Sequence, residues 1–209
     1  MGGVFMRKLI RCVLLIALVS FVLDFPGITA DRQSLNDSLI RLHVVGASDT
    51  EEDQAIKLQV RDSVVNYVEE AMRHVMTFEE AKAWLKDNLP GIEKAANDVL
   101  SKLGLSQRAT VTLKKEAFPV RHYDSFSLPS GVYEALRVTI GEGQGRNWWC
   151  VVFPSLCIPA AGKNMQDISA GAGFSQKLTD TVTRQEGYQI RFFFLDVLGK
   201  IENFFFGVE

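Results

Sequence analysis

The chain has 209 residues, of which 47% are hydrophobic and 23% are charged, and its formal net charge is −2. This apolar fraction and small net charge exclude an intrinsically disordered chain, and the slight acidic excess argues against a nucleic-acid-binding protein. Three cysteines are too few for a small disulfide-dense scaffold. The length fits one globular domain with an additional segment.

The first thirty residues have the pattern of an export signal. The basic residues Arg7, Lys8 and Arg11 precede an apolar run at 12–23, and Ala30 offers a small residue for cleavage. The run is shorter than the roughly 20 apolar residues that a membrane-spanning helix needs. We therefore expect residues 1–30 to be a secretory signal peptide, with an uncleaved N-terminal membrane anchor as the alternative.

Residues 31–209 would then form a single secreted domain that keeps two cysteines, Cys150 and Cys157. An even number of cysteines in an oxidising compartment favours a disulfide. Pro154 and Ser155 offer the turn that two cysteines seven residues apart need for bonding. Two buried thiols remain the alternative, and a metal pair is disfavoured because no histidine lies nearby in sequence.

The first part of this domain predicts one strand followed by three helices. Apolar and polar side chains alternate over 39–45, which indicates a strand, and an apolar stripe over 51–75 indicates a long helix. Thr77 and Glu80 have the spacing of a capping box at the start of a second helix. Pro90 fits the first turn of a third helix.

The second part predicts mainly strands. Alternating or strongly apolar patterns indicate strands at 109–115, 132–140, 148–153 and 188–194. Helices are expected at 175–185 and 195–206, and the small and polar residues at 160–174 indicate a flexible segment. Helices followed by strands predict an α+β fold. We expect a single domain with a mostly antiparallel sheet and a C-terminal helix.

No established catalytic motif is present. The glycine-rich loop at 141–145 lacks the lysine and serine of a phosphate-binding loop, and it leads into a strand rather than a helix. His43, His74 and His122 lack the spacing of zinc ligands. The acidic residues at 49–53 fit the first turn of a helix, where the helix dipole favours them. The sequence therefore predicts no enzyme activity, no metal and no cofactor.

Arg146, Asn147, Trp148 and Trp149 follow the glycine-rich loop and are the predicted partner-binding residues. Successive strand side chains face opposite sides of a sheet. One tryptophan is therefore expected in the core and the other partly exposed. Exposed tryptophans are enriched at the energetic hot spots of protein interfaces.

Six of the fourteen phenylalanines lie between Phe192 and Phe206. A buried strand and a buried helix would account for most of them. The run Phe204, Phe205 and Phe206 exceeds what one buried helix face can absorb, so contact with a membrane surface or a partner is the alternative.

Several segments carry a resemblance to a known family. The most specific are IRLHVVGASD at 40–49, LPSGVYEAL at 128–136 and GEGQGRNWWCVVFPSLC at 141–157. They resemble the stage II sporulation protein R family of endospore-forming Firmicutes, closely over 39–158 and more loosely over 188–196. Ser155 departs from the family pattern, which often has a proline there.

The resemblance implies a function that the composition could not show. Members of this family are made in the forespore and exported into the space between the two membranes around it. There they activate a membrane-embedded aspartic protease of the mother cell, which then processes the precursor of the early mother-cell sigma factor. The resemblance thus implies a signalling protein, with Asn147, Trp148 and Trp149 in its most distinctive motif.

A secreted hydrolase acting on cell wall or peptide is the main alternative. Such an enzyme needs an acid, base or nucleophile with a shifted pKa in a cleft. His43, Asp49 and Asp53 all lie near the end of the first predicted strand. A pocket that joined these three residues would favour the hydrolase.

Overall fold

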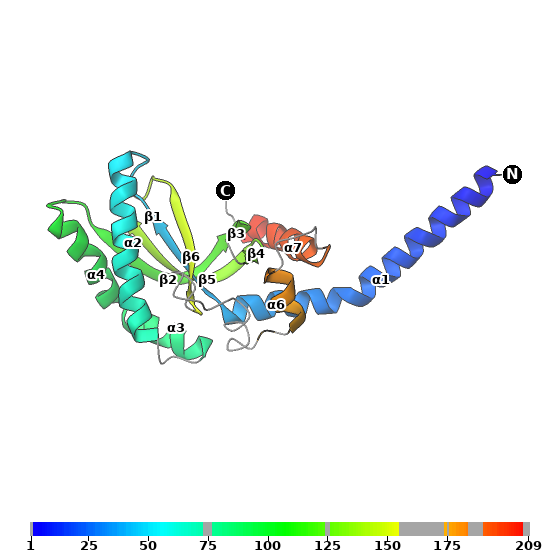
Figure 1. Cartoon of the computed structure of the whole chain (residues 1–209), viewed down its shortest axis with the longest axis horizontal. Coiled ribbons are helices and arrows are strands. Elements are labelled where there is room, and N and C mark those ends of the chain that lie inside the picture. The colour runs from blue at the N-terminus through cyan, green and yellow to red at the C-terminus, as the bar shows by residue number, and fades with distance from the viewer. Residues whose placement is uncertain are drawn as a thin grey trace.

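The computed structural model of the chain describes residues 2–72, 77–123, 126–154, 174, 176–183 and 190–206. Helices and strands follow one another as α1 (Gly2–Ser38), β1 (Ile40–Val45), α2 (Glu51–Met72), α3 (Phe78–Asp87), α4 (Leu89–Lys102), β2 (Ala109–Phe118), β3 (Arg121–His122), β4 (Ser127–Leu128), β5 (Gly131–Ile140), β6 (Asn147–Phe153), α6 (Gln176–Thr183) and α7 (Ile190–Phe206). Figure 1 shows the sheet between two groups of helices, with the first part of α1 projecting away.

The main sheet has the strand order β2-β5-β1-β6. The central strands β1 and β5 are parallel, whereas β2 pairs with β5 and β6 pairs with β1 in the antiparallel sense. A parallel pair needs a long crossover connection, and the stretch from α2 to β2 supplies it. The predicted α+β fold with a mostly antiparallel sheet and a C-terminal helix is confirmed.

One face of the sheet is covered by α2, α3 and α4. Alternate residues of β1 and β5, such as Leu42 and Leu136, point into this layer and are completely buried. Val60 and Val64 of α2 and Ile92 of α4 lie in the same core, which explains the apolar stripes of these helices.

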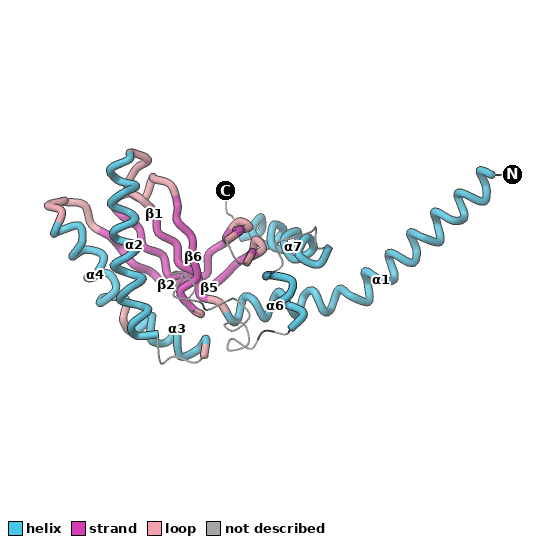
Figure 2. The backbone as a smooth tube through the Cα atoms, viewed as in Figure 1, coloured by secondary structure: helices cyan, strands magenta, loops and turns pink. Residues whose placement is uncertain are grey.

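The opposite face is covered at one end by α1, α6 and α7 (Figure 2). Their apolar side chains form a second core with residues of β2, β5 and β6, including Phe118, Tyr133 and Val151. Completely buried Arg41 also lies there, with its guanidinium 4.2 Å from the ring centre of Phe118 and 5.1 Å from that of Tyr133. Burial raises the pKa of the Tyr133 hydroxyl to about 12, although the Arg41 charge opposes this change.

The helix and strand signals before residue 154 are confirmed with small changes in bounds. Thr77 forms a capping box with Glu80: each side chain accepts a hydrogen bond from the backbone N–H of the other residue. Pro90 lies in the first turn of α4. The helix that was expected to reach residue 75 is described only to Met72, because residues 73–76, including His74, lie outside the described residues.

The predicted strand at 188–194 is wrong. Residues from Ile190 onward form one helix that continues to Phe206, while residues 184–189 lie outside the described part of the chain. Consecutive phenylalanines favour strands, but the helix places Leu195 and Leu198 one turn apart against the second core. Burial on one helix face has overridden the local preference.

The N-terminal helix α1 runs without interruption through Pro26 to Ser38. Among the described residues, no helix is long and apolar enough to cross a membrane. Ile28 and Leu35 are buried in the second core. Cleavage after Ala30 stays a prediction, and the segment at 160–174 lies outside the described residues except for Phe174.

Candidate functional site

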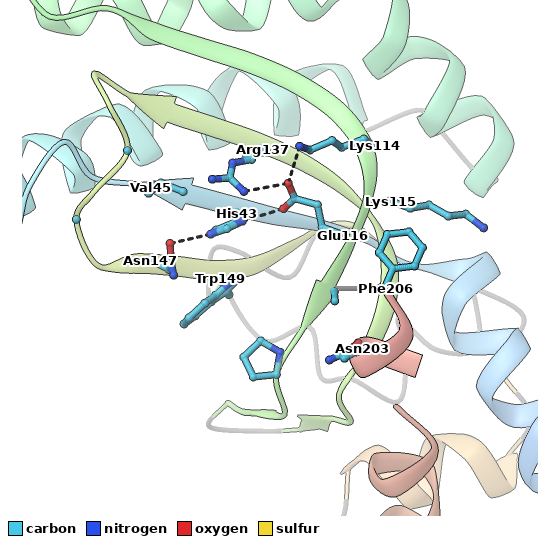
Figure 3. A pocket seen from close by; sticks show the side chains of 14 residues that line it. His43, Val45, Lys114, Lys115, Glu116, Arg137, Asn147, Trp149, Asn203 and Phe206 are labelled. Atoms are coloured by element: carbon cyan, nitrogen blue, oxygen red, sulfur yellow. Dashed lines mark hydrogen bonds and ion pairs between the residues drawn. The ribbon is translucent and has the colours of Figure 1, made fainter. Parts of the chain in front are cut away.

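A pocket of about 720 Å³ lies on the part of the sheet face that the second group of helices leaves open (Figure 3). All four strands of the main sheet contribute to it. His43 of β1 is paired across the sheet with Arg137 of β5 and with Trp149 of β6, and Glu116 comes from β2. Residues far apart in the chain therefore meet because the strand order brings them side by side.

His43 connects the polar residues of the pocket. Its Nδ1 lies 2.8 Å from Oε2 of Glu116, and its Nε2 lies 2.9 Å from Oδ1 of Asn147. The other carboxylate oxygen of Glu116 lies 3.2 Å from Nη1 of Arg137 and 3.5 Å from Nζ of Lys114. His43 and Glu116 are both buried, so this network fixes the floor of the pocket.

The environment lowers the pKa of Glu116. Burial alone would raise this pKa, but the hydrogen bond from His43 and the charges of His43 and Arg137 outweigh that effect. The folded state therefore holds the carboxylate in its ionised form more strongly than the unfolded chain does.

We expect Glu116→Gln to weaken the acid dependence of stability. A carboxyl group with a lowered pKa stabilises the fold above its unfolded pKa, and this contribution disappears as pH falls through the folded pKa. The free energy of unfolding of the variant should be lower than that of the wild type by about 1–3 kcal/mol at neutral pH. This difference should shrink as the pH falls. Urea unfolding from neutral to acidic pH measures this, with exposed Glu142→Gln as the control. Equal losses at all pH values would contradict the assignment.

The two tryptophans of β6 face opposite sides of the sheet. Trp149 lies at the pocket, where it stacks on His43 with ring centres 5.7 Å apart, and the Arg121 guanidinium lies 3.6 Å from its ring centre. Trp148 lies on the side of α2, is 37% exposed, and has the guanidinium of Arg61 4.3 Å from its ring centre. Neither tryptophan is fully buried, so the expectation of one core tryptophan is met only in part.

The predicted partner-binding residues are thus divided between two surfaces. Asn147 and Trp149 line the pocket. Arg146 lies beside α2, where its backbone N–H donates to Asp49 and its carbonyl oxygen accepts from the buried Lys57. The burial of Lys57 lowers the pKa of its amine, and the nearby charge of Arg146 adds to this change.

Comparison with known proteins identifies the family of this chain. Residues 36–163, more than half of the chain, match the family model of stage II sporulation protein R. The stage II sporulation protein R of Bacillus subtilis (strain 168) is 31% identical over 178 residues, which cover 77% of this chain and 80% of that protein. The chain belongs to the stage II sporulation protein R family. No solved structure matches it.

Membership of the stage II sporulation protein R family gives the chain a role in sporulation. The matched residues include all four strands of the main sheet and therefore most of the pocket. Asn203 and Phe206 of α7, which close one side of the pocket, lie beyond the match. In this family member the pocket is built by the shared sheet and completed by a separate C-terminal helix.

The residues suggested for a hydrolase do not come together in this stage II sporulation protein R family member. His43 lines the pocket, but Asp49 accepts a hydrogen bond from the Arg146 backbone, and Asp53 accepts one from the Ser48 hydroxyl. The pocket therefore does not join the three, and the condition that would have favoured the hydrolase is not met. In the described part of the chain, no group of three histidine, cysteine or acidic residues could hold a metal ion.

The charged residues around His43, namely Lys114, Glu116 and Arg137, were not among the residues that the sequence predicted for a site. Lys114 and Glu116 lie two positions apart on β2, and Arg137 is the charged residue on the pocket side of β5. Their alternation could have shown that each faces the polar side of a strand. Only the strand order shows that they meet.

Two remaining predictions concern the ends of this region. Cys150 is buried in the first core, but Cys157 lies outside the described residues, so their disulfide stays a prediction. At the end of α7, Phe204 is 80% exposed, Phe205 is 81% exposed and Phe206 is 52% exposed. Their exposure agrees with the surplus of aromatic residues noted in the sequence.

Proposed function

We propose that this protein is a secreted sporulation signal that is made in the forespore and activates a membrane-embedded aspartic protease of the mother cell. The activated protease would process the precursor of the early mother-cell sigma factor. Membership of the stage II sporulation protein R family carries this proposal. The export pattern of residues 1–30 supports a place in the space between the forespore and mother-cell membranes.

An activator acts by binding the active state of its target more tightly than the inactive state. Changing a 1:99 population into 99:1 requires a differential affinity of about 5.5 kcal/mol. A surface with a few aromatic and arginine residues can supply this much energy. Trp148 with Arg61, and Trp149 with Arg121, offer such groups on either side of β6.

The end of α7 supports a contact near the membrane. Ile201, Phe204, Phe205 and Phe206 are all exposed on this helix. In amphipathic helices that bind a membrane surface, aromatic residues of the apolar face insert into the boundary between lipid headgroups and acyl chains. We propose that these phenylalanines hold the domain at the membrane surface, close to a membrane-embedded target.

The decisive experiment reconstitutes the pathway in non-sporulating cells. The protease and the sigma-factor precursor are expressed with and without this protein, and precursor cleavage is followed by immunoblot. We expect cleavage only when the protein is present and exported. Cleavage that is independent of the exported, folded protein, or that never occurs with it, would contradict the proposal.

Within the same assay, Trp149→Ala is expected to reduce precursor cleavage about tenfold or more, as removal of an interface hot spot does. Trp148→Ala tests the other side of β6, and Tyr67→Ala removes a comparably exposed aromatic residue from α2 as the control. Circular dichroism of each variant establishes that it is folded. Full signalling by both folded tryptophan variants would remove β6 from the proposed contact.

One observation bears on the alternative of a secreted hydrolase: His43 is buried in a pocket and hydrogen-bonded to a carboxylate, as a general base often is. Its other ring nitrogen is already engaged by Asn147. Among the described lining residues, however, there is no hydroxyl or thiol group that could act as a nucleophile. Release of soluble fragments from cell wall or peptides by purified protein, abolished in Glu116→Gln, would support the hydrolase instead.

A further inference from the structure

The outer edge of β2 is a sheet edge without a neighbouring strand. β2 stands at one end of the order β2-β5-β1-β6, and among the described strands it pairs only with β5. The N–H of Gly141 donates to the carbonyl oxygen of Arg108, which fixes the alternation of this antiparallel ladder. Even-numbered residues of β2 therefore exchange hydrogen bonds with β5, and odd-numbered residues direct their N–H and C=O groups outward.

Side chains of α4 cover the first part of this edge. The amide of Asn97 donates to the carbonyl oxygen of Ala109 at 2.8 Å and accepts from the N–H of Ala109 at 3.0 Å. The carboxylate of Glu93 accepts from the N–H of Val111 at 3.0 Å. These bonds satisfy outward backbone groups as a neighbouring strand would, and this cover ends at the N–H of Val111.

The next part of the edge is open. In the described structure, no group accepts a hydrogen bond from the outward N–H of Leu113, Lys115 or Ala117. Lys114 and Lys115 are exposed, and Leu113 and Ala117 are half-buried, so solvent reaches this stretch. An exposed strand edge of this kind presents its unpaired backbone groups to another strand. Residues 113–117 are called the open edge below.

Positive charge flanks the open edge on both faces of the sheet. Lys114 lies on the pocket side, where its Nζ is 3.5 Å from Oε1 of Glu116, and its side chain is 57% exposed. Lys115 points away from the pocket (Figure 3) and forms no ion pair with the described residues. Its neighbour across the strand pair, Glu134, is bound to Lys82 of α3 instead. The charge of Lys115 is therefore left for a partner.

These lysines decide which strand the open edge accepts. Lysines on a sheet edge discourage pairing with unrelated strands, whereas opposite charges across a strand pair stabilise the pair. Complete antiparallel overlap with the open edge of a second copy would set Lys115 directly opposite Lys115, and like charges in that position are destabilising. A strand that carries acidic residues is the complementary occupant.

We propose that the open edge binds an extended acidic segment of a partner protein, which adds a fifth strand to the main sheet beside β2. Main-chain hydrogen bonds to residues 113–117 supply affinity in this mode of binding, and the side chains supply specificity. Because successive side chains of a strand face opposite sides, two consecutive acidic residues can meet Lys114 and Lys115. The inference deepens the proposed function and rests on it for the partner, which would be the exposed part of the activated protease.

The test measures binding of fluorescein-labelled peptides to the full-length chain in non-ionic detergent by fluorescence anisotropy. The glutamate peptide has two central glutamates between threonine- and valine-rich flanks, and the glutamine peptide has two glutamines in their place. The proline peptide keeps the glutamates but has a proline on either side of them, which removes main-chain donors. Lys115→Glu reverses a charge of the open edge, and Lys102→Glu makes the same change at the exposed end of α4.

We expect the glutamate peptide to bind, with an affinity that falls about tenfold in Lys115→Glu and changes little in Lys102→Glu. The glutamine and proline peptides should each bind about tenfold more weakly or less. The inference is overturned if the glutamate peptide does not bind to the wild-type chain, or if the two lysine variants lose affinity equally. Equal binding of the proline peptide would also overturn it, because charge alone would then hold the peptide.

A second copy of the chain is tested separately by size-exclusion chromatography. We expect the wild-type protein and both lysine variants to elute alike without peptide. Self-association that changes in Lys115→Glu and not in Lys102→Glu would overturn the inference and assign the open edge to a second copy.

The reconstituted pathway separates this inference from the proposed function. Cleavage that requires the protein, together with no binding of the glutamate peptide, would overturn the open-edge site and leave the activator role in place. Peptide binding, together with cleavage that does not require the protein, would overturn the activator role and leave the open-edge site in place. Full cleavage with folded Lys115→Glu that no longer binds the peptide would overturn the protease as the partner.

Discussion

Replacing Gly199 by alanine is expected to destabilise the protein by about 3 kcal/mol, the upper range for forcing extra volume into a packed site. A Cβ atom at this position would lie only 1.7 Å from the carbonyl oxygen of Ser130. Glycine to alanine in an exposed helix normally increases stability by about 1 kcal/mol. The close contact between α7 and the start of β5 therefore reverses the sign of the effect.

The interactions around Gly199 explain why the helix cannot simply move away. Asp196, one turn earlier, accepts hydrogen bonds from both the backbone N–H and the hydroxyl of Ser130, at 3.0 and 2.6 Å. Burial would raise the pKa of Asp196, but hydrogen bonds from Lys200 and Ser130 lower it. A displaced α7 would leave these groups without partners, and it would also move Asn203 and Phe206 out of the pocket wall.

Urea unfolding of Gly199→Ala measures the loss, and Ile201→Ala on the exposed side of the same helix is the matched control. Ile201 is 49% exposed, so its replacement should change stability by no more than about 0.5 kcal/mol. A Gly199→Ala variant as stable as Ile201→Ala would show that α7 does not pack as closely on Ser130 as the structure indicates.

The fold was predictable wherever a local pattern and its burial agree. The stripe of α2, the Thr77 capping box and the alternation of β2 and β5 each reflect a face that the structure buries. Prediction failed at Phe192–Phe194, because strand preference and helix burial point to different elements there. In the observed helix, Leu195 is buried in the second core and Leu198 packs against it.

The site was predictable in part. Asn147 and Trp149 could be found because they stand in an unusual motif, and both line the pocket. Glu116 and Arg137 could not be connected to His43, since their meeting depends on β1 lying beside β5 in a parallel pair. Composition and spacing do not specify which strands become neighbours. The sequence alone therefore does not show that these charged residues share one pocket.

Leu35→Ala is expected to lower the free energy of unfolding by about 2–5 kcal/mol, the usual loss when a fully buried leucine is truncated to alanine. Leu35 is 1% exposed and lies in the second core, where α1 meets α7. Nearby, Arg32 of α1 forms an ion pair with Glu202 and donates a hydrogen bond to the carbonyl oxygen of Leu195. The last turns of α1 are therefore part of the folded domain.

Leu23→Ala provides the control on the same helix, because Leu23 is 75% exposed and its truncation should change stability by about 0.5 kcal/mol at most. A chain that begins at Asp31 keeps Leu35 but loses Ile28, whose burial contributes about 1.5–3 kcal/mol. We therefore expect the processed domain to unfold at lower urea than the full chain, yet to remain folded. If Leu35→Ala were no less stable than Leu23→Ala, the last turns of α1 would not pack into the second core as the structure shows.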